Sequence, residues 1–329
     1  MTSVGRIELR KGHLLDSGGS FGFSSLLQEQ MCYLGQQLVF EESSQTLERL
    51  LGITVTAKQI ERICHYYGEE IEKQTERVII TGGVAPERND GKRYYAMFDG
   101  SLILTREEKW KEMKLARIFD EKQITSTSKN RNLIGESTYV AHLGNYRKFF
   151  QKVECHLDNK AEIIFIADGA KWIWKTVESF YPESVQILDF YHAKEHLCQW
   201  AELVFKDKTE KKNWVNAQCL WMLNDKIESV IKNIRDIKVS APKKRSAQKA
   251  LIEYYTTNLH RMKYRTFRSQ GLLIGSGPIE AAHKNVIQQR LKLCGQRWTK
   301  QGAQQIANLR ATNKSNQWHK VVELIKKAA

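Results

Sequence analysis

The sequence predicts an α/β protein in which a mixed sheet is flanked and interrupted by helical segments. Strand-like apolar runs alternate with amphipathic helices over residues 93–205, a polar and basic helical pattern fills 206–270, and a turn followed by a helix begins at 271. We therefore expect a helical domain at 1–77, a linker at 78–92, the first part of the sheet core at 93–205, a helical insertion at 206–270, the second part of the core at 271–315 and a basic tail at 316–329.

The N-terminal segment carries clear helix signals over residues 24–72. Thr56, followed three residues later by Gln59, has the spacing of a capping box and predicts the start of a new helix. A helix, a turn containing Gly52 and a second helix give the outline of a helix-turn-helix, a candidate DNA-binding unit. A small helical bundle without any DNA contact would give the same outline.

The core segment shows strand and helix patterns in a definite order. Residues 93–106 and 110–120 are strand-like and are separated by a charged turn, which predicts an antiparallel pair, and a third strand is expected around 123–130. The later elements are predicted as a helix at 138–157, a strand at 162–167, a helix at 170–180, a strand at 185–190 and a helix at 191–205. Gly277 and Pro278 predict the start of a last core helix.

The charge is distributed very unevenly along the chain. The net charge is +15, yet residues 1–90 carry 9 Lys or Arg against 13 Asp or Glu. From Gly271 to the end the only acidic residues are Glu280 and Glu323, against ten basic ones. A basic surface of this kind favours a polyanion such as nucleic acid as partner, although a generally solvated basic face is the alternative.

The composition also indicates in which cellular compartment the protein is expected. No apolar run approaches the roughly 20 residues that cross a bilayer, and the first residues lack the apolar centre of a signal peptide. The six cysteines are scattered singly, which argues against a disulfide framework or a zinc ribbon and favours small buried thiols. These features predict an intracellular protein with no membrane partner.

Three acidic residues stand where secondary structure would bring carboxylates to one end of a sheet. Asp99 and Asp168 each follow a strand-like run and precede a glycine, and Glu280 lies in the first turn of a helix. Two Mg²⁺ ions about 4 Å apart need oxygen ligands from several segments, and these three residues meet that need. Singly, Asp99 could be a turn residue, Asp168 a helix cap and Glu280 the acid of a capping arrangement.

The stretch from Ile187 to Leu197, ILDFYHAKEHL, contains the H-x-x-E-H pattern of inverted zinc peptidases. In that interpretation His192 and His196 bind zinc and Glu195 is the base. It leaves the basic C-terminal half and the strand ends at Asp99 and Asp168 unexplained, so His196 as an ordinary helix residue is the better interpretation.

Taken together, "MFDGS", "IADGAKWIW", "DFYHAKEHL" and "GSGPIEAAHKNVIQQRLK" followed by "GQRWTKQGAQQIANLRA" resemble DDE transposases of bacterial insertion sequences. The sequence is most similar to the ISKra-type family and more distantly to Mutator-like transposases, over roughly residues 25–315. The resemblance implies a ribonuclease H-like core with an all-helical insertion, in which Asp99, Asp168 and Glu280 bind two Mg²⁺ or Mn²⁺ ions. Such enzymes also carry a [C/D]-x-x-H element, which Asp189 and His192 match as auxiliary active-site residues.

The implied activity is metal-dependent cleavage of DNA at element ends and strand transfer into target DNA. Double-stranded DNA would be the partner, a homodimer or larger homo-oligomer the acting form, and the bacterial cytoplasm, near the nucleoid, the location. A ribonuclease H-like nuclease or resolvase, or a catalytically idle DNA-binding remnant, remain alternatives. Relatives often carry an N-terminal cysteine-rich segment for end recognition; none is visible here, so recognition could rely on the helical segment 24–72.

Basic and aromatic residues near the last core helix and in the insertion supply a candidate DNA surface. Arg297 beside Trp298 offers a guanidinium for phosphate and an indole for stacking on an unpaired base, although Trp298 could equally belong to the core. The candidate DNA-binding residues are Lys284, Arg290, Lys292, Arg297, Trp298, Lys300, Arg261, Lys263, Arg265, Arg268, Lys243, Lys244 and Arg245.

Overall fold

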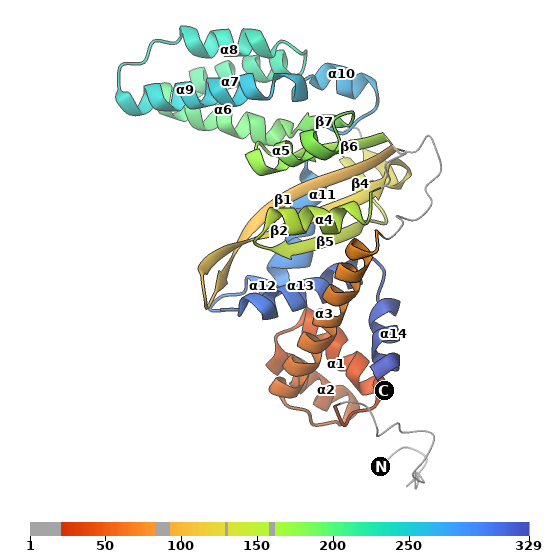
Figure 1. Ribbon diagram of the computed structural model, residues 1–329. Coiled ribbons are helices and arrows are strands. Elements are labelled where there is room, and N and C mark those ends of the chain that lie inside the picture. Colours follow the sequence, from red (N-terminus) through yellow and green to blue (C-terminus); the bar gives the residue numbers. More distant parts are fainter. Residues whose placement is uncertain (1–20, 83–92, 129–130, 158–161, 329) are drawn as a thin grey trace, which may run out of the picture.

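A computed structural model of the chain describes residues 21–82, 93–128, 131–157 and 162–328. A mixed sheet occupies the middle of the molecule, with the insertion helices at one end and the N-terminal helices at the other (Figure 1). The C-terminal helices return past the sheet to the N-terminal ones, so the first and the last helix of the described residues lie at the same end of the molecule.

The central sheet has five strands in the order β5-β2-β1-β6-β7. Strand β2 runs antiparallel to its neighbours β1 and β5, whereas β6 and β7 run parallel to β1. The strand bounds are Arg93–Thr105 for β1, Lys109–Asp120 for β2, Thr138–Leu143 for β5, Glu162–Ala167 for β6 and Val185–Leu188 for β7. A turn of 3-10 helix, η1 (Glu121–Gln123), leads to a separate two-stranded sheet of β3 (Ile124–Ser128) and β4 (Arg131–Ile134).

One prediction for this region was wrong. The strand expected around 123–130 is present as β3, although it pairs with β4 outside the central sheet. The strand that follows β2 in the central sheet is β5, so the first part of the helix predicted at 138–157 is a strand. Only Tyr146–Glu154 forms the helix α4, which begins after Gly144 in the left-handed region (φ 94°) and the capping side chain of Asn145. A short apolar run fits the period of a helix as well as that of a strand, and hydrogen bonds to distant β2 decide it.

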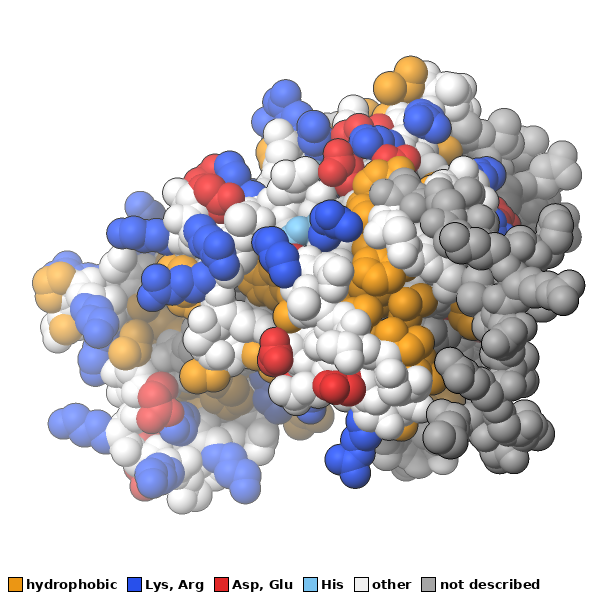
Figure 2. All heavy atoms as spheres, turned by 90° about the horizontal axis from the view of Figure 1, so that it is seen from below, with side chains coloured by type: hydrophobic (Ala, Val, Ile, Leu, Met, Phe, Trp, Pro, Cys, Tyr) orange, Lys and Arg blue, Asp and Glu red, His pale blue; other side chains and the backbone are white. Residues whose placement is uncertain are grey.

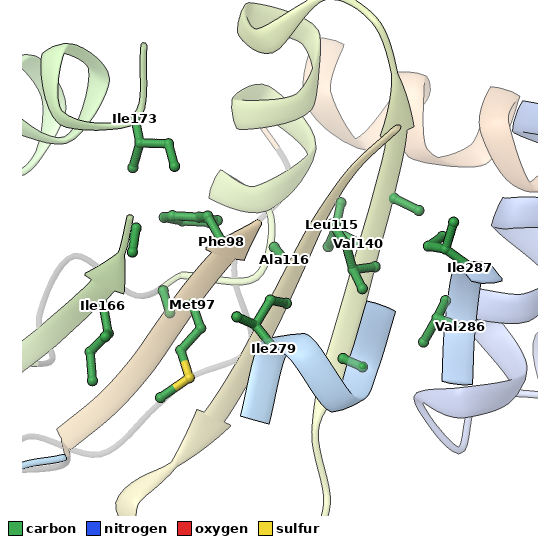
Figure 3. Packing of buried hydrophobic residues seen from close by; sticks show 14 of the residues in the cluster. Met97, Phe98, Leu115, Ala116, Val140, Ile166, Ile173, Ile279, Val286 and Ile287 are labelled. Atoms are coloured by element: carbon green, nitrogen blue, oxygen red, sulfur yellow. The ribbon is translucent and has the colours of Figure 1, made fainter. Parts of the chain in front are cut away.

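Helices cover both faces of the sheet. Neighbouring residues of β1 point to opposite faces, so each meets a different set of helices. Phe98 packs on Phe149 of α4 and on Phe165 of β6, and the helix α5 (Lys171–Phe180) adds Ile173 to that side. On the other side, Figure 3 shows Met97 directed at Ile279 of the helix α11 (Gly277–Ala282). Asp99, two residues after Met97, therefore lies on the side of α11.

All the regular secondary structure described in residues 206–270 is helical, and this segment packs on the helix α6 (Phe190–Val204). Tyr255 fastens it there, since its hydroxyl donates a hydrogen bond to the Ala193 carbonyl oxygen at 2.8 Å. The bounds are Lys208–Met222 for α7, Ile227–Asp236 for α8, Pro242–Thr257 for α9, Leu259–Arg261 for the short 3-10 helix η2 and Tyr264–Ser269 for α10.

The N-terminal helices pack against the end of the chain. The predicted capping box of Thr56 and Gln59 is confirmed at the start of the helix α3 (Ala57–Ile80). Helix α3 packs along α13 (Lys300–Lys314), where the Asn308 side chain donates to the Gly68 carbonyl oxygen at 3.0 Å. The remaining helices of this region are α1 (Ser25–Gln37), α2 (Phe40–Leu51) and α14 (His319–Ala328), the last lying within the segment expected to be a basic tail.

The other global expectations concern membranes and cysteines. Among the helices of the described residues, none is both long and apolar enough to cross a membrane. All six cysteines are free thiols; Cys32, Cys64 and Cys219 are buried as expected, whereas Cys294 is exposed.

The contact between α3 and α13 leaves no room for a side chain at Gly68. A Cβ at this position would lie 2.4 Å from the Gln305 carbonyl oxygen. Alanine favours a helix over glycine by about 1 kcal/mol, but overpacking costs about 1–3 kcal/mol. We expect Gly68→Ala to lower the free energy of unfolding in urea, and exposed Lys73→Ala on the same helix to change it by less than about 0.5 kcal/mol. A stabilised Gly68→Ala protein would contradict the close packing.

Candidate active site

Three carboxylates follow residues that are aligned across three neighbouring parallel strands. Phe98 of β1 pairs with Ala167 of β6, which pairs with Leu188 of β7. Their successors, Asp99, Asp168 and Asp189, therefore reach the same level of the sheet. Strands β6 and β7 end there, whereas β1 continues past Asp99 to Thr105 as one arm of the hairpin with β2.

Asp168 lies half-buried at the centre of this row. Its Oδ1 accepts the Ala170 backbone N–H at 3.0 Å, but the N-cap residue of α5 is Ala170 and the helix has no side-chain cap, so Asp168 is not the cap of that helix. Burial raises the pKa of Asp168; the Ala170 hydrogen bond and nearby His192 oppose that rise, and the Asp99 carboxylate adds to it. A cation at this point would relieve the desolvation and the repulsion at once.

Asp99 is flanked by a buried histidine. Its Oδ1 accepts the Gly100 N–H at 2.7 Å, and its Oδ2 lies 3.7 Å from His283 Nε2. His283 is 2% exposed, and neither ring nitrogen has a hydrogen-bond partner in the described part of the chain. The helical spacing of His283 from Glu280 is visible in the sequence, but it predicted a DNA-facing residue and not a member of the acidic site. Glu112 of β2, which also raises the pKa of Asp168, was missed as well.

Asp189 links two segments that are far apart in the sequence. It is fully buried, and its Oδ1 accepts the Tyr191 N–H at 2.7 Å at the start of α6. Its Oδ2 accepts both the backbone N–H of Ser276, at 3.1 Å, and the Ser276 hydroxyl. Since Ser276 is the residue that precedes α11, Asp189 ties the end of β7 directly to the start of the helix that carries Glu280.

Helix α11 has two further anchors on the sheet. The Arg117 guanidinium of β2 donates to the Pro278 carbonyl oxygen at 3.0 Å, and Ile279 is buried against β1 and β2. Glu280, the next residue, is exposed and makes neither a hydrogen bond nor an ion pair with any described residue. Among the described residues Glu280 therefore makes no capping hydrogen bond at the start of α11. A π-helical segment, η3 (His283–Gln288), and α12 (Gln289–Leu291) continue this helix.

The most compact group of potential metal ligands is not the predicted triad. Ligand atoms of Asp189, His192 and Glu280 lie within 4.8 Å of one another, and within the described residues this is the only such group. Asp99 and Asp168 stand beside it, since Asp168 interacts electrostatically with both Asp99 and His192. The chemistry of this donor set, carboxylates from β1, β6, β7 and α11 with one imidazole, suits Mg²⁺ or Mn²⁺.

The insertion places a tyrosine over this edge of the sheet. Tyr254 of α9 packs on Gly169, where a Cβ would lie 2.0 Å from the tyrosine ring, and its ring centroid is 4.5 Å from that of His196. The Tyr254 hydroxyl has no hydrogen-bond partner among the described residues. No sequence signal pointed to Tyr254, because its approach depends on how the insertion folds back. His196, which the peptidase interpretation needs as a zinc ligand, belongs to none of the compact ligand groups within the described chain.

The candidate DNA-binding residues divide by exposure. Arg261, Arg290 and Trp298 are buried. Arg261 donates to Gln186 and to Asn258, so packing accounts for its position. Lys244 is half-buried, and the exposed members are Lys243, Arg245, Lys263, Arg265, Arg268, Lys284, Lys292, Arg297 and Lys300. Contact of any of them with DNA stays a prediction.

Comparison with known proteins places the chain in a family. The model of the uncharacterised protein family UPF0236 matches residues 36–328, so the chain belongs to that family. It is similar to the "UPF0236 protein in vanSb 3'region" of Streptococcus gallolyticus, with 25% identity over 304 residues. That alignment covers 87% of this chain and 63% of the relative, so the chain spans less than two thirds of the relative's length.

The tether between Asp189 and Ser276 can be tested by its contribution to stability. Ser276→Ala removes a hydroxyl donor from a fully buried carboxylate, so we expect a loss of about 1–3 kcal/mol in the free energy of unfolding. The matched control is Ser101→Ala, because the Ser101 hydroxyl is buried and has no partner among the described residues. That change should be neutral or stabilising. Equal losses in the two variants, measured by urea denaturation, would count against the tether.

Proposed function

We propose that this member of the UPF0236 family is a DDE transposase, which cleaves DNA at element ends and transfers the cut strand by metal-dependent phosphoryl transfer. The observation that carries the proposal is the alignment of Asp99, Asp168 and Asp189 at one level of three parallel strands, with Glu280 held next to Asp189 through Ser276. Oxygen ligands from separate segments at one sheet edge are what two-metal phosphoryl transfer requires.

The order of elements supports the same proposal. Along the chain, the strands of the central sheet and the helices between them come as three strands, a helix, a strand, a helix and a strand. A helical insertion and an acidic helix follow. This is the order that the resemblance to insertion-sequence transposases of the ISKra type implies for a ribonuclease H-like core. The basic charge of the C-terminal part is the second support, because the proposed substrate is a polyanion.

In this mechanism Asp99 and Asp168 would hold Mg²⁺ or Mn²⁺ together with Glu280, whose carboxylate groups with Asp189 and His192 beside them, and the metal would supply activation of the attacking oxygen and stabilisation of the leaving one. The other residues act on these ligands. Asp189 fixes the position of the Glu280 helix through Ser276, and His283 stands against Asp99. His192, next to Asp168 and half-exposed, is placed to orient a phosphate or to move a proton.

Cleavage without strand transfer would make the protein a ribonuclease H-like nuclease or resolvase, and joined DNA products separate the two cases. The carboxylates oppose the third alternative, an idle DNA-binding remnant, because neighbouring acidic groups with a raised pKa, here Asp168 beside Asp99, are typical of functional sites.

The first test is cleavage of a labelled duplex that carries the element's own end. Purified protein should nick this duplex only with Mg²⁺ or Mn²⁺, and Asp168→Asn should lower the rate by at least about a hundredfold, since metal ligands contribute several kcal/mol to such transition states. Duplex affinity, measured without cleavage in Ca²⁺, should stay within about twofold. Salt-sensitive binding with no cleavage by the wild-type protein would favour the remnant.

The same variant separates a metal ligand from a structural residue through pH. Because the pKa of Asp168 is raised in the folded protein, its ionisation opposes folding, and that penalty develops as the pH rises from below about 4 through the raised pKa. Asp168→Asn can still accept the Ala170 N–H, so we expect it to unfold at a higher temperature than the wild type at pH 7 and to lose this advantage near pH 4. A less stable variant at pH 7 would indicate that the charge itself supports the fold.

A further inference from the structure

A small pocket lies where the N-terminal helices meet the tip of the β1–β2 hairpin and the loop that follows α12. It has a volume of about 270 Å³, and its wall includes Phe40, His65, Arg106, Arg290, Arg297 and Trp298. These residues come from α2, α3, the hairpin and the C-terminal block, so four separate parts of the chain build it. The elements that line it, among them α2, α3, α12 and the tip of the β1–β2 hairpin, lie in the lower half of Figure 1. Figure 2 shows many Lys and Arg side chains on the face of the molecule seen from below.

The wall of this pocket is strongly basic. Three arginines line it, and Glu61 is its one acidic lining residue among those described. Glu61 is itself paired with Lys58 at 2.8 Å, which reduces its effect on the pocket. Low-dielectric walls, here the rings of Phe40 and Trp298, focus the field of such cations. An anion is therefore the ligand that the charge favours.

Arg290 is the least expected of the three arginines, because it is only 1% exposed. Its Cζ lies 4.7 Å from the ring centroid of Phe40 and 4.9 Å from that of Trp298, and its Nε donates to the Gly35 carbonyl oxygen at 3.1 Å. Burial lowers its pKa to about 10, which leaves the guanidinium charged at neutral pH. Its Nη2 has no hydrogen-bond partner among the described residues.

Two other wall atoms share this property. Within the described residues, His65 Nε2 and Gln296 Oε1 are also buried and unpartnered. A buried polar group without a partner is costly, and in native proteins it often marks the place of a ligand or an ion. The unsatisfied donor of the charged Arg290, and His65 Nε2 when it carries the ring proton, match the acceptor oxygens of a phosphate, whereas Gln296 Oε1 is itself an acceptor.

The loop that carries Arg297 is held rigidly on the hairpin. Trp298 donates its N–H to the Leu104 carbonyl oxygen at 3.1 Å, and Arg106 donates its N–H to the Trp298 carbonyl oxygen at 2.8 Å. The Trp298 indole N–H donates to Leu291 at 3.2 Å. Trp298 therefore acts as a wall of the pocket and supports Arg290, while Arg106 and Arg297 remain exposed at the rim.

We propose that this pocket binds one phosphate group of a nucleic-acid backbone, with Arg290 as its floor and Arg106 and Arg297 at its rim. The identification of the phosphate as a DNA phosphate rests on the proposed function. Arg106 lies seven residues after Asp99 on one continuous strand and its turn, which spans about 23 Å at about 3.3 Å per residue. At about 3.4 Å per base pair, a duplex cut at Asp99 would reach the pocket about six or seven base pairs away.

The test compares single-charge variants of the intact protein. Arg106→Gln and Arg297→Gln each remove one exposed rim cation, whereas Lys111→Gln removes an equal charge from the same hairpin outside the pocket, where it pairs with Glu108. We expect calorimetric titration with inorganic phosphate to show binding that weakens about tenfold in each rim variant and less than about twofold in Lys111→Gln. No phosphate binding by the wild type, or equal losses in all three variants, would overturn the site.

A second measurement identifies the source of the phosphate. At constant ionic strength, inorganic phosphate should weaken duplex binding by the wild-type protein and should need about tenfold higher concentration to do so in the rim variants, and each rim variant should lower the salt slope of duplex binding by about one. Phosphate that binds the pocket without affecting the duplex would assign a free phosphate and refute the backbone contact. Both measurements are made without cleavage, so failure of the transposase activity would not be mistaken for failure of the pocket.

Discussion

The candidate site depends above all on the buried carboxylate of Asp189. Its two oxygens accept hydrogen bonds from Tyr191 and from Ser276, and Ser276 lies 87 residues after Asp189 in the chain. The whole helical insertion is contained between these two points, so this one group returns the chain to the sheet after the insertion and determines where Glu280 lies. A buried carboxylate is stable only when it is well supplied with donors, and the two Ser276 donors and the Tyr191 N–H provide them. An interaction needed for the fold thus also sets the geometry of the acidic cluster.

The described residues carry much of their unfavourable polar chemistry at the two places for which functions are proposed. Beside the carboxylates, the ring nitrogens of His283 and the hydroxyl of Tyr254 have no hydrogen-bond partner, and in the basic pocket the same holds for Arg290 Nη2 and His65 Nε2. The raised pKa of Asp168 adds like-charge repulsion at the first place. Proteins generally retain such costs where binding or catalysis repays them. The two regions also complement each other, since one is acidic and suits a metal cation, whereas the other is basic and suits a phosphate.

Local signals predicted the parts of this structure that local interactions decide. The capping box at Thr56 and the proline at the start of α11 were both foreseen, as were strands β1, β2, β6 and β7 and therefore the positions of Asp99 and Asp168 at one edge. Strand β5 was taken for a helix because its pairing with β2 is a long-range property. The grouping of Glu280 with Asp189 and His192, rather than with Asp99 and Asp168, follows from the Ser276 tether, which no spacing in the sequence reveals.

The N-terminal helices and the C-terminal block that packs on them are connected to the candidate active site through strand β1. The N-terminal helices are not a separate appendage, because α3 packs on α13, and Arg290 donates to Gly35 of α1. The same strand carries Asp99 in the acidic row and leads to Arg106 at the rim of the basic pocket. A phosphate held in that pocket would therefore lie at a fixed distance from the carboxylates, because a hydrogen-bonded strand rather than a flexible linker joins the two places. A rigid connection of this kind fixes the number of base pairs between a contacted phosphate and a cut, which is the property that a protein acting at a defined DNA end requires.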